Sequence, residues 1–246
     1  DVLVANADDP RIAARMGGFG GRVVTFGMDV PADVRATSIV VRGLDGTTAT
    51  VETPAGDFEL ETSLLGLGNL SNVLAATAVA LQFDVPLDAI ATAVAALRPA
   101  RRRGELIRLP GGVTLIDDSY NSSPSALRRA LETLTAATGS ARKIAVLGEM
   151  LELGAHATAL HEECGAAAAA AGLHVLVTVG GEPARAMADA AVRSGMPHGS
   201  VIYVTSSGEA ADAAVARTRA GDLVLVKGSR GIGVDVVVER LKAEFA

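Results

Sequence analysis

The stretch GVTLIDDSYNSSPSAL, residues 112–127, decides the fold class of this chain. It opens with a short apolar run, passes through a polar segment and ends in apolar spacing that is typical of a helix. A Val/Ile/Leu-rich run without polar alternation predicts a strand buried on both faces, as in a parallel sheet covered by helices. The polar segment DDSYN then follows the carboxyl end of the strand, where such sheets bind their ligands.

The same pattern recurs four more times toward the C-terminus. Further strands are predicted from KIAVLGEM, HVLVTVGG, SVIYVTS and DLVLVKGS. Helices are predicted over residues 123–137, 155–171, 182–194, 207–219 and 234–245. Alternating strands and helices predict a Rossmann-like α/β domain with a parallel sheet. The polar segments DDSYN, GEMLELG, GGEP, TSS and KGSRG all follow strands, so they should line one edge of that sheet.

The first hundred residues mix strand and helix signals. The segments ATSIVVRG, TTATVET and DFELET alternate and are separated by turn formers, which predicts a small antiparallel patch. Helices are expected over residues 69–82, capped by Asn69 or Ser71, and over 86–97, starting with Pro86. The segment RPARRRGE, with four arginines and Pro99, is typical of a solvated linker. We therefore expect two domains, residues 1–99 and 100–246.

Composition excludes several classes of protein. The chain has 246 residues, is 49% hydrophobic and carries a formal charge of −6, which gives no support for a nucleic-acid partner. No apolar run approaches the roughly 18 residues of a membrane span. The single cysteine, Cys164, excludes an internal disulfide or a Cys-rich zinc site, which favours a reducing, cytoplasmic setting. Because DVLVANADDP already looks like a core strand, we expect the chain to be the C-terminal part of a longer protein.

Motif searches give one firm exclusion and one candidate. A Walker phosphate loop needs Gly-Lys-Ser/Thr, and none of Lys143, Lys227 and Lys242 lies in that context. GGFGG precedes a strand and reads as a turn. KGSRGIG instead follows a strand and precedes a helix, so its backbone N–H groups, with Lys227 and Arg230, could hold a carboxylate or phosphate.

Other polar clusters leave their chemistry open. In NADDP, Asp9 or Asn6 can cap a helix that Pro10 starts. DDSYN could supply carboxylates for acid–base catalysis, or hydrogen bonds to ribose and a polar substrate. The histidines show no trustworthy metal spacing, since His156 and His161 are five residues apart. We assign no catalytic and no metal-ligating residue.

Seven motifs in order carry a family resemblance. They are NADDP, GLGNLSNVLAA, RRRGE, LIDDSYNSSP, LGEMLELG, LHEECG and LVKGSRGIGVDVVVERL. Together they resemble the Mur ligases of peptidoglycan synthesis, and within them the branch that adds D-alanyl-D-alanine to UDP-N-acetylmuramoyl-tripeptide. The resemblance implies that residues 1–99 are the last part of the central, ATP-binding α/β domain and 100–246 the complete Rossmann-like C-terminal domain.

The implied reaction forms an amide bond. ATP, with Mg²⁺, phosphorylates the substrate carboxylate, and the amine of D-Ala-D-Ala attacks the acyl phosphate. The resemblance implies that the phosphate loop, most of the ATP and Mg²⁺ sites and the UDP-binding domain belong to a missing N-terminal portion of the same protein. The 246 residues alone should then be inactive.

The resemblance also implies roles for individual residues. The nucleotide-binding positions are Asn69, Asn72, Arg103 and Asp118, where Asn69 and Asn72 match an adenine-contacting segment and Asp118 a ribose ligand. The implied substrate-binding positions are Tyr120, Asn121, Lys227, Ser229 and Arg230.

Three departures from the family pattern keep alternatives open. Gly68 stands where a histidine is expected, Ser122–Ser123 where Ala-Asn is more common, and Val234 where methionine is common. The alternatives are another Mur-type or folylpolyglutamate-type ligase, or a catalytically silent module that binds a nucleotide or a partner.

Overall fold

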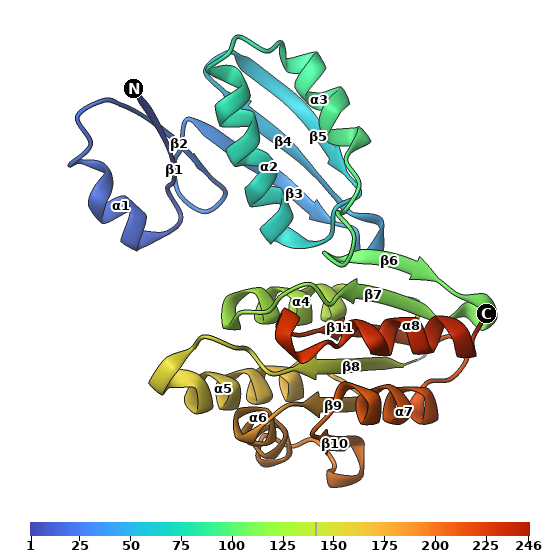
Figure 1. Cartoon of the computed structure of the whole chain (residues 1–246). Helices are drawn as coiled ribbons and strands as arrows, with labels where there is room; N and C mark the ends of the chain where they lie inside the picture. The colour runs from blue at the N-terminus through green and yellow to red at the C-terminus, as the bar shows by residue number, and fades with distance from the viewer. Residues whose placement is uncertain (141) are drawn as a thin grey trace. The chain divides into compact units, whose positions relative to one another are not determined.

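The computed structural model describes residues 1–140 and 142–246. The chain divides into two compact units, Asp1–Arg98 and Pro99–Ala246. Each unit has its own sheet and helices (Figure 1) and is described by itself. The prediction of a mixed α/β fold is confirmed.

The first unit is built on a five-stranded sheet. Its strands lie in the order of the sequence: β1 (Val2–Asn6), β2 (Arg22–Gly27), β3 (Val34–Val41), β4 (Thr47–Thr53) and β5 (Gly56–Thr62). The pairs β1–β2 and β2–β3 are parallel, whereas β3–β4 and β4–β5 are antiparallel. The predicted antiparallel patch is therefore present, and it continues a parallel sheet.

Three helices accompany this sheet: α1 (Pro10–Met16), α2 (Gly66–Leu81) and α3 (Leu87–Ala96). As expected, Asp9 caps α1 by accepting the Arg11 N–H, with Pro10 in the first turn. The buried side chains of α2 and α3 pack on the sheet and form the unit's core. The predicted start of α2 was wrong by three residues. The helix begins at Gly66, and Asn69 donates to the Leu65 carbonyl at 2.9 Å rather than capping.

The second unit contains a six-stranded sheet. In spatial order its strands are β10 (Val201–Val204), β9 (Val175–Val179), β8 (Lys143–Gly148), β11 (Leu223–Lys227), β7 (Thr114–Asp118) and β6 (Glu105–Arg108). The first five are parallel, and β6 pairs antiparallel with β7 at the sheet's end. All five predicted strands are present, whereas β6 was not predicted.

Helices cover both faces of the second sheet (Figure 1). They are α4 (Pro124–Ala136), α5 (Ala157–Ala170), α6 (Glu182–Arg193), α7 (Ser207–Arg217) and α8 (Asp235–Glu244). Every residue of β9 and β11 is buried, as the continuous apolar runs predicted. In residues 1–140 and 142–246 we find no helix long and apolar enough to cross a membrane.

The parallel register brings the predicted polar segments to one edge. Lys227 lies opposite Asp118 on one side of β11 and opposite Leu147 on the other. Beyond this point β8 and β11 continue into two facing glycines, Gly148 and Gly228. A Cβ added at Gly228 would lie 2.9 Å from the Cα of Gly148, so neither position has room for a side chain. The backbones of the two exit loops can therefore approach one another closely.

Candidate functional site

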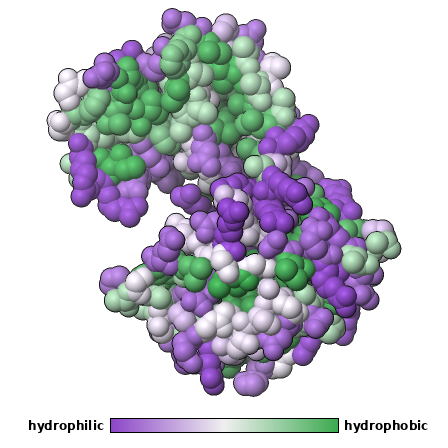
Figure 2. Space-filling model, in the orientation of Figure 1, coloured by the Kyte–Doolittle hydropathy of each residue, from purple (hydrophilic) through white to green (hydrophobic). Residues whose placement is uncertain are grey.

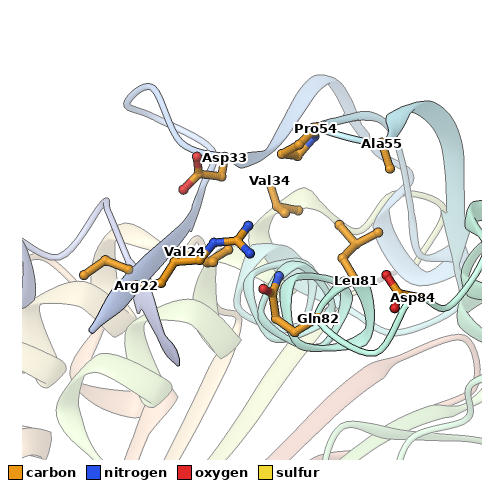
Figure 3. A pocket seen from close by; sticks show the side chains of 10 residues that line it. Arg22, Val24, Asp33, Val34, Pro54, Ala55, Leu81, Gln82 and Asp84 are labelled. Carbon is orange, nitrogen blue, oxygen red and sulfur yellow. The ribbon is translucent and has the colours of Figure 1, made fainter. Parts of the chain in front are cut away.

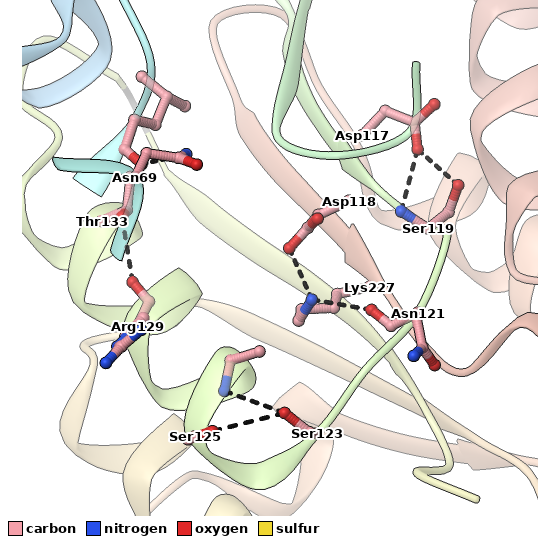
Figure 4. Close-up of polar contacts among 12 residues, drawn as sticks. Asn69, Asp117, Asp118, Ser119, Asn121, Ser123, Ser125, Arg129, Thr133 and Lys227 are labelled. Carbon is pink, nitrogen blue, oxygen red and sulfur yellow. Dashed lines mark hydrogen bonds and ion pairs between the residues drawn. The ribbon is translucent and has the colours of Figure 1, made fainter. Parts of the chain in front are cut away.

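A partly buried ion pair forms the centre of the carboxyl edge of the second unit. The Lys227 Nζ lies 2.7 Å from the Asp118 Oδ2 and donates a second hydrogen bond, of 2.9 Å, to the Asn121 carbonyl (Figure 4). The Lys227 side chain is 4% exposed and that of Asp118 is 23% exposed. The lysine therefore joins the end of β11 to the polar segment after β7.

A tight turn sets the direction of that polar segment. The Asp117 Oδ1 accepts the Ser119 hydroxyl at 2.5 Å and the Ser119 N–H at 3.2 Å (Figure 4). Such an aspartate-centred turn reverses the chain directly after a strand. Asp117 and Ser119 are buried, whereas Tyr120 and Asn121 are exposed beyond them. The turn therefore presents the tyrosine ring and the asparagine amide to solvent.

Asp118 combines burial with a free acceptor oxygen. Desolvation raises the pKa of this carboxyl above its usual value, against the lowering effects of Lys227 and, more weakly, of Arg103. Its Oδ2 is bound to Lys227, while Oδ1 accepts no hydrogen bond from any residue that the structure describes. A partly exposed carboxylate with one unused oxygen can accept a bond from a sugar hydroxyl.

Two arginines share one tyrosine ring. The Arg103 guanidinium carbon lies 4.2 Å from the centre of the Tyr120 ring, and that of Arg230 lies 5.7 Å away. Both distances fall within the range of cation–π attraction. Neither arginine forms an ion pair with a carboxylate among residues 1–140 and 142–246. The result is a local excess of positive charge beside Asp118 that suits an anionic ligand.

Ser229 has a different environment from that expected of a ligand-binding hydroxyl. It is 4% exposed, and its Oγ accepts the Leu151 N–H at 2.9 Å. The Ser229 N–H donates to the Glu149 carbonyl at 3.2 Å. Its neighbour Arg230 opens a short 3-10 turn, Arg230–Ile232, so α8 does not directly follow the strand. Ser229 thus connects the loops that follow β8 and β11.

The two predicted asparagines lie on the first turns of α2 in the first unit. Asn69 is partly buried, with its amide nitrogen bound to the Leu65 carbonyl (Figure 4). Asn72 is exposed. Three residues apart, they share one helix face, so both amides can reach the same flat polar group.

The family resemblance implies two cofactors, ATP and Mg²⁺. The open Asp118 oxygen and the paired arginines fit a nucleotide, which offers hydroxyls and phosphate anions. In the described residues, no three or more His, Cys, Asp or Glu side chains are grouped to hold a metal ion. The described residues therefore offer no cluster of three such ligands for Mg²⁺.

A separate cavity of about 350 Å³ lies in the first unit (Figure 3). It opens between the start of β2, the start of β3, the β4–β5 turn and the end of α2, and it contains no predicted site residue. Asp33 on its wall accepts the Thr25 N–H at 2.7 Å, and such bonds hold the pKa of this carboxyl below its usual value. Apolar residues also gather on the surface of this unit (Figure 2). Val79 and Phe83 are among its exposed large apolar side chains. Neither feature identifies a ligand.

The fold and site define a class of protein. Residues 102–230 match the family described as "Mur ligase, glutamate ligase domain", and residues 1–80 match "Mur ligase middle domain". The chain belongs to the Mur ligase family.

Within this family the chain is similar to ligases of one named activity. Over 99% of its length the chain is 34% identical to UDP-N-acetylmuramoyl-tripeptide--D-alanyl-D-alanine ligase of Mycobacterium tuberculosis, of which it covers 51%. The corresponding Escherichia coli ligase is 36% identical over 61% of the chain and 32% of that protein. The crystal structure of MurF from Acinetobacter baumannii is similar over 98% of the chain and 52% of its own, with a TM-score of 0.84 and 25% identity. The chain spans about half the length of the curated relatives it matches.

A MurF ligase structure from Thermotoga maritima, in complex with ADP, has the same fold. Its TM-score is 0.82 at 24% identity, covering 99% of this chain and 53% of that one.

Of the positions that the sequence predicted, those of the second unit lie together at the carboxyl edge of its sheet. The carboxyl edge does hold Arg103, Asp118, Tyr120, Asn121, Lys227, Ser229 and Arg230 in one unit. The sequence analysis assigned no role to His161 and Glu149, which hold the loop after β8 in place. The signal in the sequence was that LGEMLELG follows a strand and that LHEECG lies in the helix after it.

Proposed function

We propose that this chain is part of an ATP-dependent ligase that joins D-alanyl-D-alanine to UDP-N-acetylmuramoyl-tripeptide in peptidoglycan synthesis. The observation that carries this proposal is the 34% identity, over 99% of the chain, to ligases with that printed activity. The arrangement of charges at the carboxyl edge of the second unit supports it. We place the reaction in the cytoplasm, because both UDP-linked substrate and ATP are cytoplasmic metabolites.

Four residues are proposed to bind the nucleotide. Asp118 would accept a ribose hydroxyl through its unused oxygen, and Arg103 would neutralise phosphate charge. Asn69 and Asn72 would hydrogen-bond the adenine ring from their shared helix face. When bound, ATP would supply the phosphoryl group that activates the substrate carboxylate.

The amino substrate is proposed to bind beside the tyrosine ring. D-Ala-D-Ala carries a terminal carboxylate, which suits Arg230 next to Tyr120, and Asn121 offers an exposed amide. The side chains of Lys227 and Ser229 already bind protein groups. Their contribution is therefore to fix the Asp118 segment and the Arg230 turn around the substrate.

The phosphate loop and the magnesium ligands are proposed to come from outside these 246 residues. The sequence contains no Walker motif, and a loop of that kind holds the transferred phosphates in other ATP-dependent enzymes. We therefore propose that the missing N-terminal portion of the protein is the chain's essential partner, and that residues 1–246 alone do not ligate.

The experiment compares the full-length gene product with residues 1–246. Phosphate release and formation of the pentapeptide product are measured with ATP, Mg²⁺, UDP-N-acetylmuramoyl-tripeptide and D-Ala-D-Ala. Full-length protein should turn over only with the dipeptide, and the 246 residues should not. A panel of single amino acids and glutamyl acceptors separates other Mur-type and folylpolyglutamate-type ligases. ATP binding without turnover on any acceptor would refute the proposal in favour of a silent binding module.

A further inference from the structure

His161 is a buried titratable group without a role in the chemistry described so far. It lies on α5 and is fully buried. Its Nε2 lies 2.8 Å from the Met150 N, and its Nδ1 lies 2.6 Å from the Ala157 carbonyl oxygen. A carbonyl can only accept, so Nδ1 carries the proton and Nε2 accepts the Met150 N–H. Both ring nitrogens of a neutral imidazole are therefore engaged.

The histidine bond is one of several that tie down the loop Glu149–Leu151 after β8. The Glu149 N–H donates to the Val179 carbonyl at 2.9 Å, and the Leu151 N–H donates to the Ser229 Oγ at 2.9 Å. The Glu149 Oε2 also accepts the Gly181 N–H at 2.6 Å. All three successive backbone N–H groups of this loop are thus satisfied by other elements, one of them by His161.

The loop in turn supports the turn that carries Arg230. Leu151 binds Ser229 through its backbone, and its side chain lies so close to Gly231 that an added Cβ there would be 2.8 Å from the Leu151 Cδ1. Arg230 lies between these two contacts and reaches toward the Tyr120 ring. A shift of Met150 and Leu151 would therefore displace Arg230 from both sides.

We infer that His161 is a positioning residue that fixes Arg230 for the acceptor carboxylate by holding the loop Glu149–Leu151 against Ser229 and Gly231. The inference rests on the proposed function for the identity of the acceptor. The physical reason is that a lost acceptor would leave the Met150 N–H buried and unpaired, which the loop can relieve only by moving. Such a movement would shift the Arg230 guanidinium without removing it.

Two substitutions separate positioning from simple loss of stability. His161→Leu removes both bonds, whereas His161→Gln keeps a side-chain amide near Nε2 that can accept the Met150 N–H. The matched control is His174→Leu. His174 also accepts a backbone N–H, that of Lys143 at 3.2 Å, but at the amino end of β8.

The first measurement needs no ligase activity. Hydrogen exchange in residues 1–246 should show faster exchange of the Met150 and Leu151 amides in His161→Leu, and near-native protection in His161→Gln and in the control. Equal protection of these amides in all variants would overturn the inference, whatever the protein's activity.

The second measurement uses the full-length ligase. In His161→Leu the KM for D-Ala-D-Ala should rise by about fivefold to tenfold, with kcat and the KM for ATP within about twofold. His161→Gln should restore the dipeptide KM. A parallel change in both KM values, or no rescue by glutamine, would refute positioning. No turnover by the wild-type protein would instead refute the proposed function and leave the exchange result to decide the inference.

Discussion

Replacing Lys227 with methionine tests the ion pair at the centre of the site. Lys227 Nζ bonds the Asp118 Oδ2 at 2.7 Å and the Asn121 carbonyl at 2.9 Å, and its side chain is 4% exposed. Methionine keeps an unbranched apolar stem and removes the charge and its donors. The change therefore leaves a largely buried carboxylate without its cation and the Asn121 carbonyl without this donor.

The expected loss follows from the exposure of the two groups. Removing one partner of a buried ion pair costs about 3–5 kcal/mol of unfolding free energy. Because the Asp118 side chain retains some contact with water, we expect about 2–3 kcal/mol at neutral pH for Lys227→Met.

The loss should depend on pH in a defined direction. Burial raises the pKa of Asp118, and Lys227 lowers it, so removing the lysine raises this pKa further. A carboxyl whose pKa is higher in the folded than in the unfolded protein does not destabilise the fold below the pKa of the unfolded state. Stability is lost as the pH rises through the pKa of the folded state. The Lys227→Met deficit should therefore be largest at neutral pH and shrink on acidification through the unfolded pKa.

Tyrosine fluorescence during urea unfolding provides the assay. The chain has two tyrosines and no tryptophan, and Tyr120 and Tyr203 both belong to the second unit, so the signal follows that unit alone. Lys242→Met is the matched control, because Lys242 pairs with Glu239 on an exposed helix face and its loss should change stability by less than about 0.5 kcal/mol. A Lys227→Met deficit below about 1 kcal/mol, or one that is the same at acid and neutral pH, would refute the reasoning.

Three further predictions concern the second unit. Burial raises the pKa of the Cys164 thiol to about 11. This thiol should therefore resist a disulfide reagent at neutral pH until urea unfolds the protein, and fast labelling of the native state would contradict this. Gly165→Ala places a methyl against the Met187 carbonyl oxygen of α6 and should lower stability by about 1–3 kcal/mol. Gly208→Ala, with open space around it, should be neutral or stabilising, and equal urea midpoints for the two variants would argue against this packing. Hydrogen bonds within a capping box lower the pKa of Glu209. Its stabilising effect is therefore complete above the pKa of the unfolded state and is lost as the pH falls through the pKa of the folded state. Glu209→Gln should be less stable than wild type only in the upper range of a pH series of urea unfolding.

The strands of the second unit were predictable because a strand buried on both faces has a distinctive composition. LVLVK and VLVTV contain only one polar residue each, a terminal lysine and a threonine, so they lack the alternation of a strand with one face in solvent. β6 was missed because ELIR is short, follows the arginine cluster and pairs on one side only. The start of α2 was misplaced because Gly66 and Gly68 are poor helix formers, and contacts with the sheet outweigh that propensity.

The edge on which the site lies was predictable for a topological reason. Parallel strands end on the same side, so polar segments after several strands must meet there. Which of their side chains contact one another was not predictable. Lys227 and Asp118 were assigned to different ligands, yet they form one ion pair across 109 positions of sequence. Ser229 was assigned to a ligand, yet its hydroxyl binds a backbone N–H of the loop after β8.

The sequence by itself determined the α/β class, the family resemblance and the edge where ligands would gather, because these depend on local composition and on the order of motifs. Only the tertiary structure decided which polar groups remain available to a ligand. That outcome depends on strand order, since β11 lies between β7 and β8 and brings the KGSRG segment against two loops distant in sequence. The same strand order places the loop after β8, which His161 helps to hold, against Ser229, the neighbour of Arg230.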